Sequence, residues 1–546
     1  MWSNFFPKYE KDPQGLLDFV SGSVWQQLKQ EYGDIFGESF SIRKPTTLKT
    51  ILKNIHPINL TATDTDVKGD AFEYFLKTVT NGNKDLGEYF TPRHIVRTMV
   101  NIVKPKYGET IYDPFCGTGG FLLECFKYLS LRTDPTNQEM MRWIRNQALH
   151  GRELTSTARI TKMNMILFGD GHTNIQKMDS LENPINSKFD IVLSNIPYSQ
   201  KTDYGSYYSI PTDNADSVCV QHIWRSLKPK GRAAVIVPET FLYEDGVIGM
   251  TRKMIVEQSS KFTVISLPRG VFMPYTPTKT NILFFEKGGQ FNRAFFFVVH
   301  NDGFELNTQR KPIKGESDIK KLLSDFDTPK VIEAKANIVD RETILESGNW
   351  NLRPYFYMDD VPNINMEMVA LSEEVIQCID DKINPRKQPD VIWKLLEVSQ
   401  NGIFLKHSIP GSEFTQNYKV VKKGDIAYNP HRVNIGSIGV VPEYLDGGLV
   451  SPAYVVLRVI GNDYPPAYIV SVLKQPRYLK VIMNYSLASA RASLPFEELK
   501  RIQIPKPNTS DIESLAAMEN EWYDYSLLCD QKKNEIDQYT KSFLKL

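Results

Sequence analysis

Apolar and polar residues alternate most regularly in the middle of the chain. Between residues 88 and 287, short apolar runs of strand type are separated by segments long enough for a helix. This rhythm is typical of a parallel sheet with crossover helices, so we predict a doubly wound, Rossmann-like α/β domain over residues 86–315. The apolar runs are Thr110–Tyr112, Ala148–His150, Asp190–Leu193, Ala233–Val237, Phe262–Ser266 and Asn281–Phe285.

The segments on either side have other patterns. Residues 1–85 have helical spacing and predict a helical N-terminal domain. Residues 316–365 predict a connector, and residues 366–510, rich in short strands and turns, predict a separate α+β domain. Residues 511–546 lack proline and glycine and repeat apolar residues every three or four positions. This spacing predicts a long helix with a narrow apolar stripe.

Composition narrows the class of protein. At 546 residues the chain is too long for a single hydrophobic core. Hydrophobic residues make up 41% and charged residues 24%, as in an ordinary soluble protein, and no run of about 18 apolar residues occurs. The first residues, Met1–Phe5, lack the features of a signal peptide. We therefore expect a cytoplasmic protein that does not engage a membrane.

Charge and cysteine usage add little to this description. The formal net charge of +1 neither favours nor opposes a nucleic-acid partner, because a basic footprint can be local. The cysteines form no CxxC motif and no Cys/His cluster, which indicates free thiols in a reducing compartment and no structural metal. They are Cys116, Cys125, Cys219, Cys378 and Cys529.

A glycine-rich motif follows the first strand of the predicted sheet. It reads Asp113-Pro-Phe-Cys-Gly-Thr-Gly-Gly120 and precedes a predicted helix. Glycines here remove Cβ atoms that would block a ligand, and free amides at the helix start favour a negatively polarised group. The order is GxGG rather than GxGxxG, so the dinucleotide fingerprint is not met. The motif therefore predicts a nucleotide-type cradle of another kind.

Two carboxylates follow the next two strand-like segments, Glu153 after Ala148–His150 and Asp179 after Asn174–Met178. Glu153 could accept hydrogen bonds from a ribose diol, although its distance along the chain from the glycines exceeds the ~20 residues usual in dinucleotide folds. Asp179 could accept from an adenine amine. For either residue alone, an exposed loop charge is the favoured interpretation.

The second chemical motif, Asn195-Ile-Pro-Tyr198, follows the predicted strand at Asp190–Leu193. An aromatic amine becomes nucleophilic only when acceptors hold both of its hydrogens. The side-chain oxygen of Asn195 and the main-chain carbonyl of Ile196 can supply these acceptors, while Tyr198 can stack on an extruded base. Together with the cradle, this motif predicts methyl transfer to the exocyclic amine of adenine in DNA.

The order of these motifs resembles that of a known family. Gly87-Glu-Tyr-Phe-Thr-Pro92, the glycine motif, Glu153, Asp179 and the Asn195 motif occur as in the modification subunit of type I restriction-modification systems. The resemblance covers about residues 60–315 and implies a prokaryotic adenine-N6 DNA methyltransferase that uses S-adenosylmethionine. It also implies that the donor is contacted by Gly87, Glu88, Tyr89, Phe90, Thr91, Pro92, Asp113, Phe115, Gly117, Thr118, Gly119 and Gly120.

One position departs from the family pattern. The family usually has proline where Ile196 stands, but the carbonyl acceptor is kept and Pro197 still favours an extended residue before it. We expect the chemistry to survive, although a folded but inactive site is the alternative. Cytosine-N4 methylation uses the same acceptors and stays open. Cytosine-C5 methylation needs a cysteine nucleophile after a proline, and Cys116 lies in the donor loop instead.

The C-terminal region resembles one target-recognition domain of the type I specificity subunit. The matching stretches are Val420–Ala427, Ile435–Val441, Ser451–Tyr454, Arg491–Leu499 and Ile502–Pro505. Such a domain adds base contacts to a phosphate-binding surface on double-stranded DNA. A β-rich module without that role is the alternative. The candidate DNA-binding residues are Arg432, Asn434, Arg477, Lys480 and Arg491.

The helical tail resembles the spacer helices of the same subunit. Two copies of the chain that pair through the stripe from Leu515 to Phe543 would form a homodimer with two recognition domains. Equally, the helix could pack against its own chain.

Other functions remain as alternatives. A DNA-binding regulator with a vestigial donor pocket would need no turnover, and a small-molecule or protein methyltransferase would have no use for residues 366–510. No GxxxxGK[ST] loop occurs, and residues 1–85 hold no convincing nuclease-type acid cluster. Restriction, or another form of phage defence, would therefore require a separate nuclease subunit.

Overall fold

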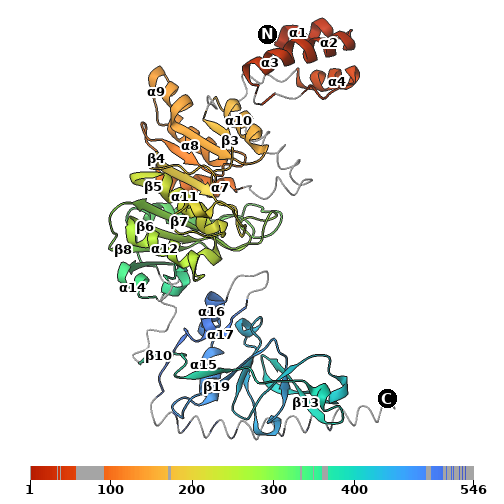
Figure 1. Cartoon of the computed structure of the whole chain (residues 1–546), viewed down its shortest axis with the longest axis vertical. Coiled ribbons are helices and arrows are strands. Elements are labelled where there is room, and N and C mark those ends of the chain that lie inside the picture. Colours follow the sequence, from red (N-terminus) through yellow and green to blue (C-terminus); the bar gives the residue numbers. More distant parts are fainter. Residues whose placement is uncertain are drawn as a thin grey trace. The chain divides into compact units, whose positions relative to one another are not determined.

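The computed structural model describes most of the chain (Figure 1). Contacts divide the chain into two compact units, Met1–Pro354 and Tyr355–Leu546. The described residues are 2–33, 35–36, 39–56, 91–169, 174–332, 335–347, 350–358, 367–486 and 493–507, together with seven separate positions between 512 and 535.

The first unit begins with a group of short helices between Trp2 and Ile55, and the rest of the helical domain predicted over residues 1–85 lies outside the described residues. Pro13 and Pro45 each occupy the first position of a helix, where the missing N–H costs nothing. The apolar faces of these helices meet in a small core formed by Phe6, Leu16, Leu48 and Leu52. The helices are α1 (Trp2–Tyr9), α2 (Pro13–Phe19), α3 (Trp25–Glu31) and α4 (Pro45–Ile55).

A large sheet forms the centre of this unit. Within the described residues it has nine strands, in the order β3-β2-β1-β4-β5-β7-β6-β8-β9. Strands β3, β2, β1, β4 and β5 are parallel to one another, whereas β7 runs antiparallel to both β5 and β6. The strands are β1 (Ile111–Asp113), β2 (Leu149–Glu153), β3 (Ile175–Lys177), β4 (Phe189–Asn195), β5 (Leu227–Pro238), β6 (Ser259–Ser266), β7 (Thr280–Lys287), β8 (Arg293–Val298) and β9 (Ala336–Asp340).

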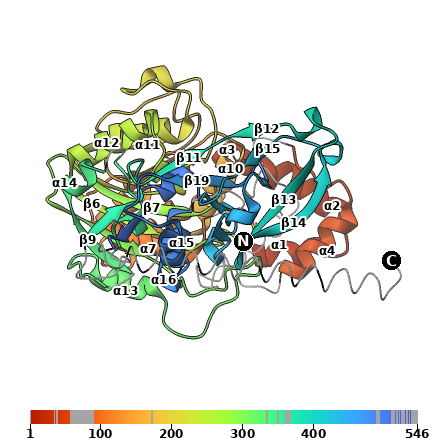
Figure 2. The ribbon, with the colours of Figure 1, turned by 90° about the horizontal axis from the view of Figure 1, so that it is seen from below.

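Helices cover both faces of the sheet, which confirms the predicted doubly wound α/β fold. Figure 2 shows α11 and α12 on one side of β6 and β7, with α7 and α13 on the other. Helices α8 and α10 share a core with α7 and α13. The helices are α7 (Arg93–Val103), α8 (Gly120–Ser130), α9 (Gln138–Trp143), α10 (Thr157–Leu167), α11 (Ala215–Ser226), α12 (Val247–Gln258), α13 (Asp318–Asp325) and α14 (Arg341–Leu345).

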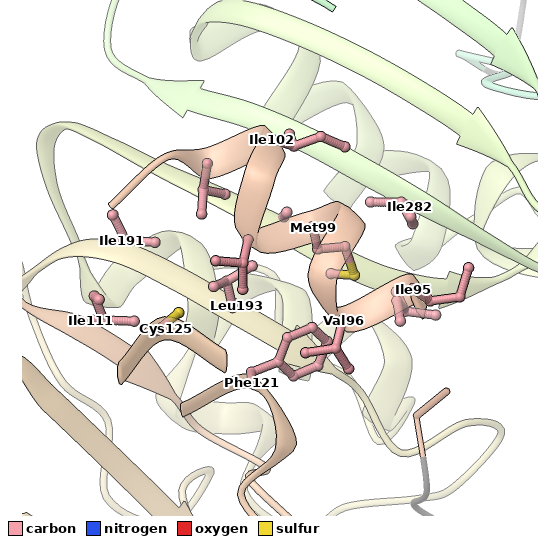
Figure 3. Close-up of a cluster of buried hydrophobic side chains, with 14 of the residues drawn as sticks. Ile95, Val96, Met99, Ile102, Ile111, Phe121, Cys125, Ile191, Leu193 and Ile282 are labelled. Carbon is pink, nitrogen blue, oxygen red and sulfur yellow. The ribbon is translucent and has the colours of Figure 1, made fainter. Parts of the chain in front are cut away.

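The main core lies between helices α7 and α8 and the sheet (Figure 3). Its members come from the apolar strand runs and from positions three and four apart on α7, the spacing that places side chains on one helix face. Burying them fixes both helices against the parallel strands. The residues labelled in Figure 3 are Ile95, Val96, Met99, Ile102, Ile111, Phe121, Cys125, Ile191, Leu193 and Ile282.

The position of the site follows from the strand order. Along the chain, β2 and β3 are added on one side of β1, and β4 and β5 on the other, so the order reverses between β1 and β4. In open α/β sheets, ligands bind beyond the carboxyl ends of the strands at such a reversal. Asp113 ends β1 and Asn195 ends β4, so both predicted motifs lie at this point.

Residues 316–365, which the sequence predicts to be a connector, contain regular structure. Leu322 of α13 and Phe326, directly after this helix, join the main core, and β9 pairs antiparallel with β8 at the edge of the sheet. The sheet therefore extends beyond residue 315, and the first compact unit ends at Pro354.

The second unit combines strands and helices, as predicted for residues 366–510. Its described part has a four-stranded sheet (β11-β19-β16-β17), a five-stranded sheet (β12-β15-β18-β13-β14) and the pair β10-β20. Two apolar cores hold these sheets and the helices together. The helices are α15 (Pro466–Leu473), α16 (Pro476–Tyr485) and α17 (Phe496–Leu499).

The strands of the second unit are short, except for the hairpin of β13 and β14. They are β10 (Met368–Ala370), β11 (Ile376–Ile379), β12 (Lys382–Ile383), β13 (Ile392–Ser399), β14 (Gly402–Pro410), β15 (Tyr418–Val420), β16 (Ile426–Tyr428), β17 (Ile438–Val440), β18 (Leu449–Val450), β19 (Val455–Val459) and β20 (Gln503–Pro505).

Two further features concern the C-terminal segment and possible membrane-spanning helices. The long helix predicted over residues 511–546 lies outside the described residues, apart from the seven separate positions. In the described part of the chain, no helix is both long enough and apolar enough to cross a membrane.

Candidate active site

A small pocket opens at the carboxyl edge of the sheet, where β1 and β4 end. It joins residues from three parts of the chain: the start of α7, the glycine-rich turn after β1, and the end of β4. Its lining residues are Thr91, Arg93, Asp113, Phe115, Cys116, Thr118, Gly120, Phe121 and Asn195. Sequence reasoning predicted six of these as site residues, but not Arg93, Cys116 or Phe121.

The glycine-rich turn has a backbone conformation that residues with a Cβ atom adopt rarely. Gly117 and Gly119 have φ angles of 52° and 85°, in the left-handed region. A Cβ atom on Gly119 would also lie 2.8 Å from the Cγ2 atom of Thr161. The turn is closed by a 2.7 Å hydrogen bond from the Gly119 N–H to the Cys116 carbonyl, and α8 begins at Gly120.

Helix α10 holds the same turn from outside the pocket. The Thr161 hydroxyl donates to the Gly117 carbonyl, and the Asn164 side-chain amide donates to the Thr118 carbonyl at 2.7 Å. Both side chains are buried. No sequence pattern marks these two residues, because they lie 44 and 46 positions along the chain from the carbonyl groups that they bind.

Asp113 is buried beneath the turn, with 1% of its surface exposed. Its Oδ1 atom accepts hydrogen bonds from the Ser194 hydroxyl at 2.7 Å and from the Phe115 N–H at 3.2 Å. Burial raises the pKa of this carboxyl to about 7, and the nearby Glu153 carboxylate adds to the rise. The carboxyl of Asp113 thus joins the ends of β1 and β4 at the base of the pocket.

Glu153 ends β2 and supports the turn rather than facing solvent. Its Oε2 atom accepts from the Gly117 N–H at 3.1 Å, and its Oε1 atom accepts from the Thr155 N–H at 2.9 Å and from the Thr155 hydroxyl at 2.6 Å. A carboxylate has about four acceptor positions, so these three bonds leave one, although Glu153 does not line the pocket.

Only some of the other residues predicted to bind the donor lie at the pocket. Asp179 is half-buried and accepts from the Leu181 N–H at 2.8 Å, but it does not line the pocket. Pro92 caps the start of α7 and places Thr91 at the pocket. The predicted contacts of Gly87, Glu88, Tyr89 and Phe90 lie outside the described residues.

The side-chain amide of Asn195 is held at both of its ends. Its Nδ2 atom donates to the Thr91 hydroxyl at 3.1 Å, and its Oδ1 atom accepts a hydrogen bond from the Tyr198 hydroxyl. Tyr198 is half-buried, and burial raises the pKa of its phenol above the ordinary value. Tyr198 is therefore close to the amide oxygen that the sequence predicts to be the acceptor.

The backbone after Asn195 is fixed by residues that the sequence did not indicate. The Ile196 side chain is buried, and its N–H points to the Ile236 carbonyl on β5 at 3.4 Å. Ser199 has a φ angle of 53°, and its N–H donates to the Asp216 carboxylate on α11 at 2.8 Å. Burial raises the pKa of Asp216 to about 6. Asp216 thus anchors the end of the motif.

A buried polar network begins at Tyr112, the residue before Asp113. His222 on α11 is fully buried between two tyrosine hydroxyls, Tyr112 at 3.2 Å from its Nε2 atom and Tyr208 at 3.0 Å from its Nδ1 atom. Burial lowers the pKa of His222 to about 3, so the ring is neutral.

The described residues contain no cluster of His, Cys, Asp and Glu that could hold a metal ion, and the described cysteines are free thiols.

The predicted DNA-binding residues belong to the second unit. Arg432 and Arg477 are exposed, and Asn434 is half-buried in the turn that contains Arg432. The side chain of Lys480 and the whole of Arg491 lie outside the described residues.

A doubly wound sheet with a glycine-rich turn and a strand-end amide at its reversal point defines the class of α/β methyltransferase-like proteins. The family model described as N-6 DNA Methylase matches residues 63–363. This match spans more than half of the chain, and the chain belongs to that family.

Curated relatives agree with this assignment. The type I restriction enzyme EcoEI methylase subunit of Escherichia coli is 30% identical over 325 residues, which cover 55% of this chain and 66% of the relative. The type I restriction enzyme EcoKI methylase subunit of Escherichia coli strain K12 is 31% identical over 268 residues, covering 46% and 50%. The chain thus spans between half and two thirds of these relatives.

Solved structures agree on the fold. A chain from a structure of a type I R-M system has a TM-score of 0.55 at 26% identity, covering 62% of this chain and 76% of that one. The type I restriction-modification system methyltransferase subunit from Streptococcus thermophilus has a TM-score of 0.53 at 23% identity, covering 64% and 79%. The resemblance to type I modification subunits is therefore confirmed, whereas a fused recognition domain is not tested by these matches.

Proposed function

We propose that this protein transfers a methyl group from S-adenosylmethionine to the N6 amine of an adenine in DNA. One observation carries the proposal: the glycine-rich turn and the side chain of Asn195 line the same pocket. A donor held by the turn and an amine held by Asn195 would therefore meet without rearrangement of the sheet. Such proximity is a major source of acceleration in two-substrate reactions.

The lining residues fit the proposed donor. Thr91, Thr118 and the guanidinium of Arg93 suit the amino-acid part of S-adenosylmethionine, whose carboxylate needs hydrogen-bond donors or a cation. The rings of Phe115 and Phe121 offer apolar surface. Glu153 does not line the pocket itself but bonds the turn through the Gly117 N–H, and its remaining acceptor position would serve a ribose hydroxyl. When bound, the donor would supply an activated methyl group on its sulfonium.

The residues after β4 would prepare the amine. The Asn195 Oδ1 atom accepts one amine hydrogen and the Ile196 carbonyl accepts the other, which localises the nitrogen lone pair. Isoleucine in place of the usual proline keeps this carbonyl. The bond from the Ser199 N–H to Asp216 holds the end of the motif, so the two acceptors stay in fixed relation to β4.

The second unit would supply the DNA sequence preference. Its α+β construction and the exposed Arg432 and Arg477 support a role as a target-recognition domain fused to the methyltransferase, on double-stranded DNA. Pairing of two copies through residues 511–546 would give a two-part recognition site. A separate nuclease subunit would complete a restriction-modification system.

Replacing Asn195 tests the proposal directly. Asn195→Ala removes one of the two acceptors, so transfer from labelled donor to DNA should fall by on the order of 100-fold or more. Binding of S-adenosylhomocysteine, measured by calorimetry, should stay close to that of the unchanged protein, because the turn is intact. Full transfer by the variant would refute the proposed role of Asn195.

The labelled product separates the alternatives. Label in N6-methyladenine supports the proposal, whereas label in N4-methylcytosine alone would reassign the base. A protein that binds both the donor and DNA but transfers no methyl group would be a DNA-binding regulator with a vestigial donor pocket. Transfer to protein or small molecules without DNA binding would indicate a small-molecule or protein methyltransferase.

A further inference from the structure

We propose that Thr91 is a positioning residue, whose hydroxyl fixes the amide of Asn195 with its oxygen toward the target amine. The inference rests on the proposed function and adds a second role to a residue first expected to contact the donor. Its basis is the 3.1 Å hydrogen bond from the Asn195 Nδ2 atom to the Thr91 hydroxyl oxygen.

The amide needs such a partner because its two ends are nearly equal in size but opposite in chemistry. The Oδ1 end accepts hydrogen bonds, whereas the Nδ2 end only donates. If the amide rotated by half a turn, it would present N–H groups to an amine that also carries N–H groups. The site would then repel the substrate instead of polarising it.

Thr91 is well placed to prevent this rotation. It directly precedes Pro92, which caps α7, and α7 is anchored by buried residues such as Ile95, Val96 and Met99. Asn195 lies at the end of β4, an inner strand paired with both β1 and β5. The backbone of Asn195 is therefore held within the sheet, and the orientation of its amide is set by its side-chain torsions and by the partners that the amide binds.

The second contact of the amide is of a different kind. The Tyr198 hydroxyl donates to the Oδ1 atom, the atom that the target amine would use. If Tyr198 moves to stack on an extruded base, its hydroxyl leaves this position. Thr91 binds the opposite end of the amide, so its contact persists while the substrate is bound.

Three substitutions on one segment test the inference. Thr91→Val keeps the shape but removes the acceptor, and should lower kcat for DNA by about tenfold, the effect of one lost hydrogen bond. Thr91→Ser keeps the hydroxyl and should recover most of the rate. Thr98→Val is the matched control on α7, because its hydroxyl donates to the His94 carbonyl, away from Asn195, and kcat should not change.

The kinetic pattern distinguishes positioning from donor binding. With the amide misoriented, Thr91→Val should lower kcat even at saturating donor, whereas loss of the proposed donor contact alone would weaken S-adenosylhomocysteine binding and leave kcat unchanged. A raised KM for the donor with an unchanged kcat would overturn the inference and leave Thr91 as a donor contact only. A Thr91→Ser variant as slow as Thr91→Val would also overturn it, since the hydroxyl would not matter.

A stability cycle tests the bond without any methyl transfer. Thr91→Val should lower Tm by on the order of 1 °C in the unchanged protein and by less in the Asn195→Ala background, where the bond is already absent. Equal losses in both backgrounds would overturn the inference. Failure of the proposed function would look different: the unchanged protein would transfer no methyl group to DNA, whatever the cycle gives.

Discussion

Asp113 contributes the carboxyl group to the lining of the pocket, and its environment is strongly perturbed. Its carboxyl is excluded from water and bonded to Ser194 and Phe115. Burial raises its pKa to about 7, against 3.8 for an unperturbed aspartate. Near neutral pH the pocket therefore exchanges a proton at its base, although no proton is required from this group in the proposed reaction.

The raised pKa predicts a pH-dependent stability. Between about pH 4 and 7 the unfolded chain has released the Asp113 proton and the folded protein keeps it, so the free energy of unfolding falls as pH rises and levels off above pH 7. Asp113→Asn cannot ionise, so its stability should fall less across this window, by on the order of 1–3 kcal/mol. Urea denaturation at several pH values measures the difference.

The control for this prediction is Ser194→Ala. It removes a hydrogen bond that favours the carboxylate of Asp113, so the decline in stability should extend to higher pH. Parallel pH profiles for Asp113→Asn and the unchanged protein would contradict the assigned titration.

Among the elements, the turn from β1 to α8 depends most strictly on its sequence. Gly119→Ala would place a Cβ atom in a left-handed residue and 2.8 Å from Thr161. The first effect costs about 1–2 kcal/mol by itself, and the contact adds to it. We expect a total loss of stability above 2 kcal/mol, measured by chemical denaturation.

Thr161→Ser provides the matched background. Serine keeps the hydroxyl that donates to the Gly117 carbonyl but lacks the Cγ2 atom. Gly119→Ala should therefore cost less in this background than in the unchanged protein. An equal cost in both would assign the whole effect to backbone conformation and contradict the proposed contact.

The elements also show what the sequence could predict. Six apolar runs correspond to β1, β2, β4, β5, β6 and β7, because a strand buried on both faces is continuously apolar. A continuously apolar run does not indicate the direction in which its strand runs, so the antiparallel orientation of β7 was not predicted. Strand β9 was missed because a long segment separates it from β8, its partner in the sheet.

The site was predicted to the extent that it is local. Gly117, Gly119 and Asn195 stand in short motifs whose chemistry can be read from neighbouring residues. Thr161 and Asp216 act through contacts made only by folding, and single residues at such separations leave no pattern. The bond between Thr91 and Asn195 spans 104 positions and needed the structure.

At the scale of the whole molecule, each compact unit has its own buried core. Domains with separate cores fold independently, so we expect fragments 1–354 and 355–546 to unfold cooperatively when expressed alone. The first should bind S-adenosylhomocysteine, and the second should bind DNA in a salt-dependent way. Calorimetry and gel-shift measurements check both.

The opposite results have clear meanings. A fragment 1–354 that binds no S-adenosylhomocysteine while folded would show that the donor site needs residues beyond Pro354. A folded fragment 355–546 without DNA affinity would remove the recognition role proposed for the second unit.

The bond between Tyr198 and Asn195 has an energetic consequence for catalysis. Because the phenol already satisfies the amide oxygen, an arriving adenine exchanges one hydrogen bond for another, and little water has to be stripped from Asn195. The free-energy cost of binding the extruded base is then mainly the cost of breaking its pairing and stacking in the duplex. An adenine opposite a mismatch or a gap should accordingly be captured more readily than one in an intact helix.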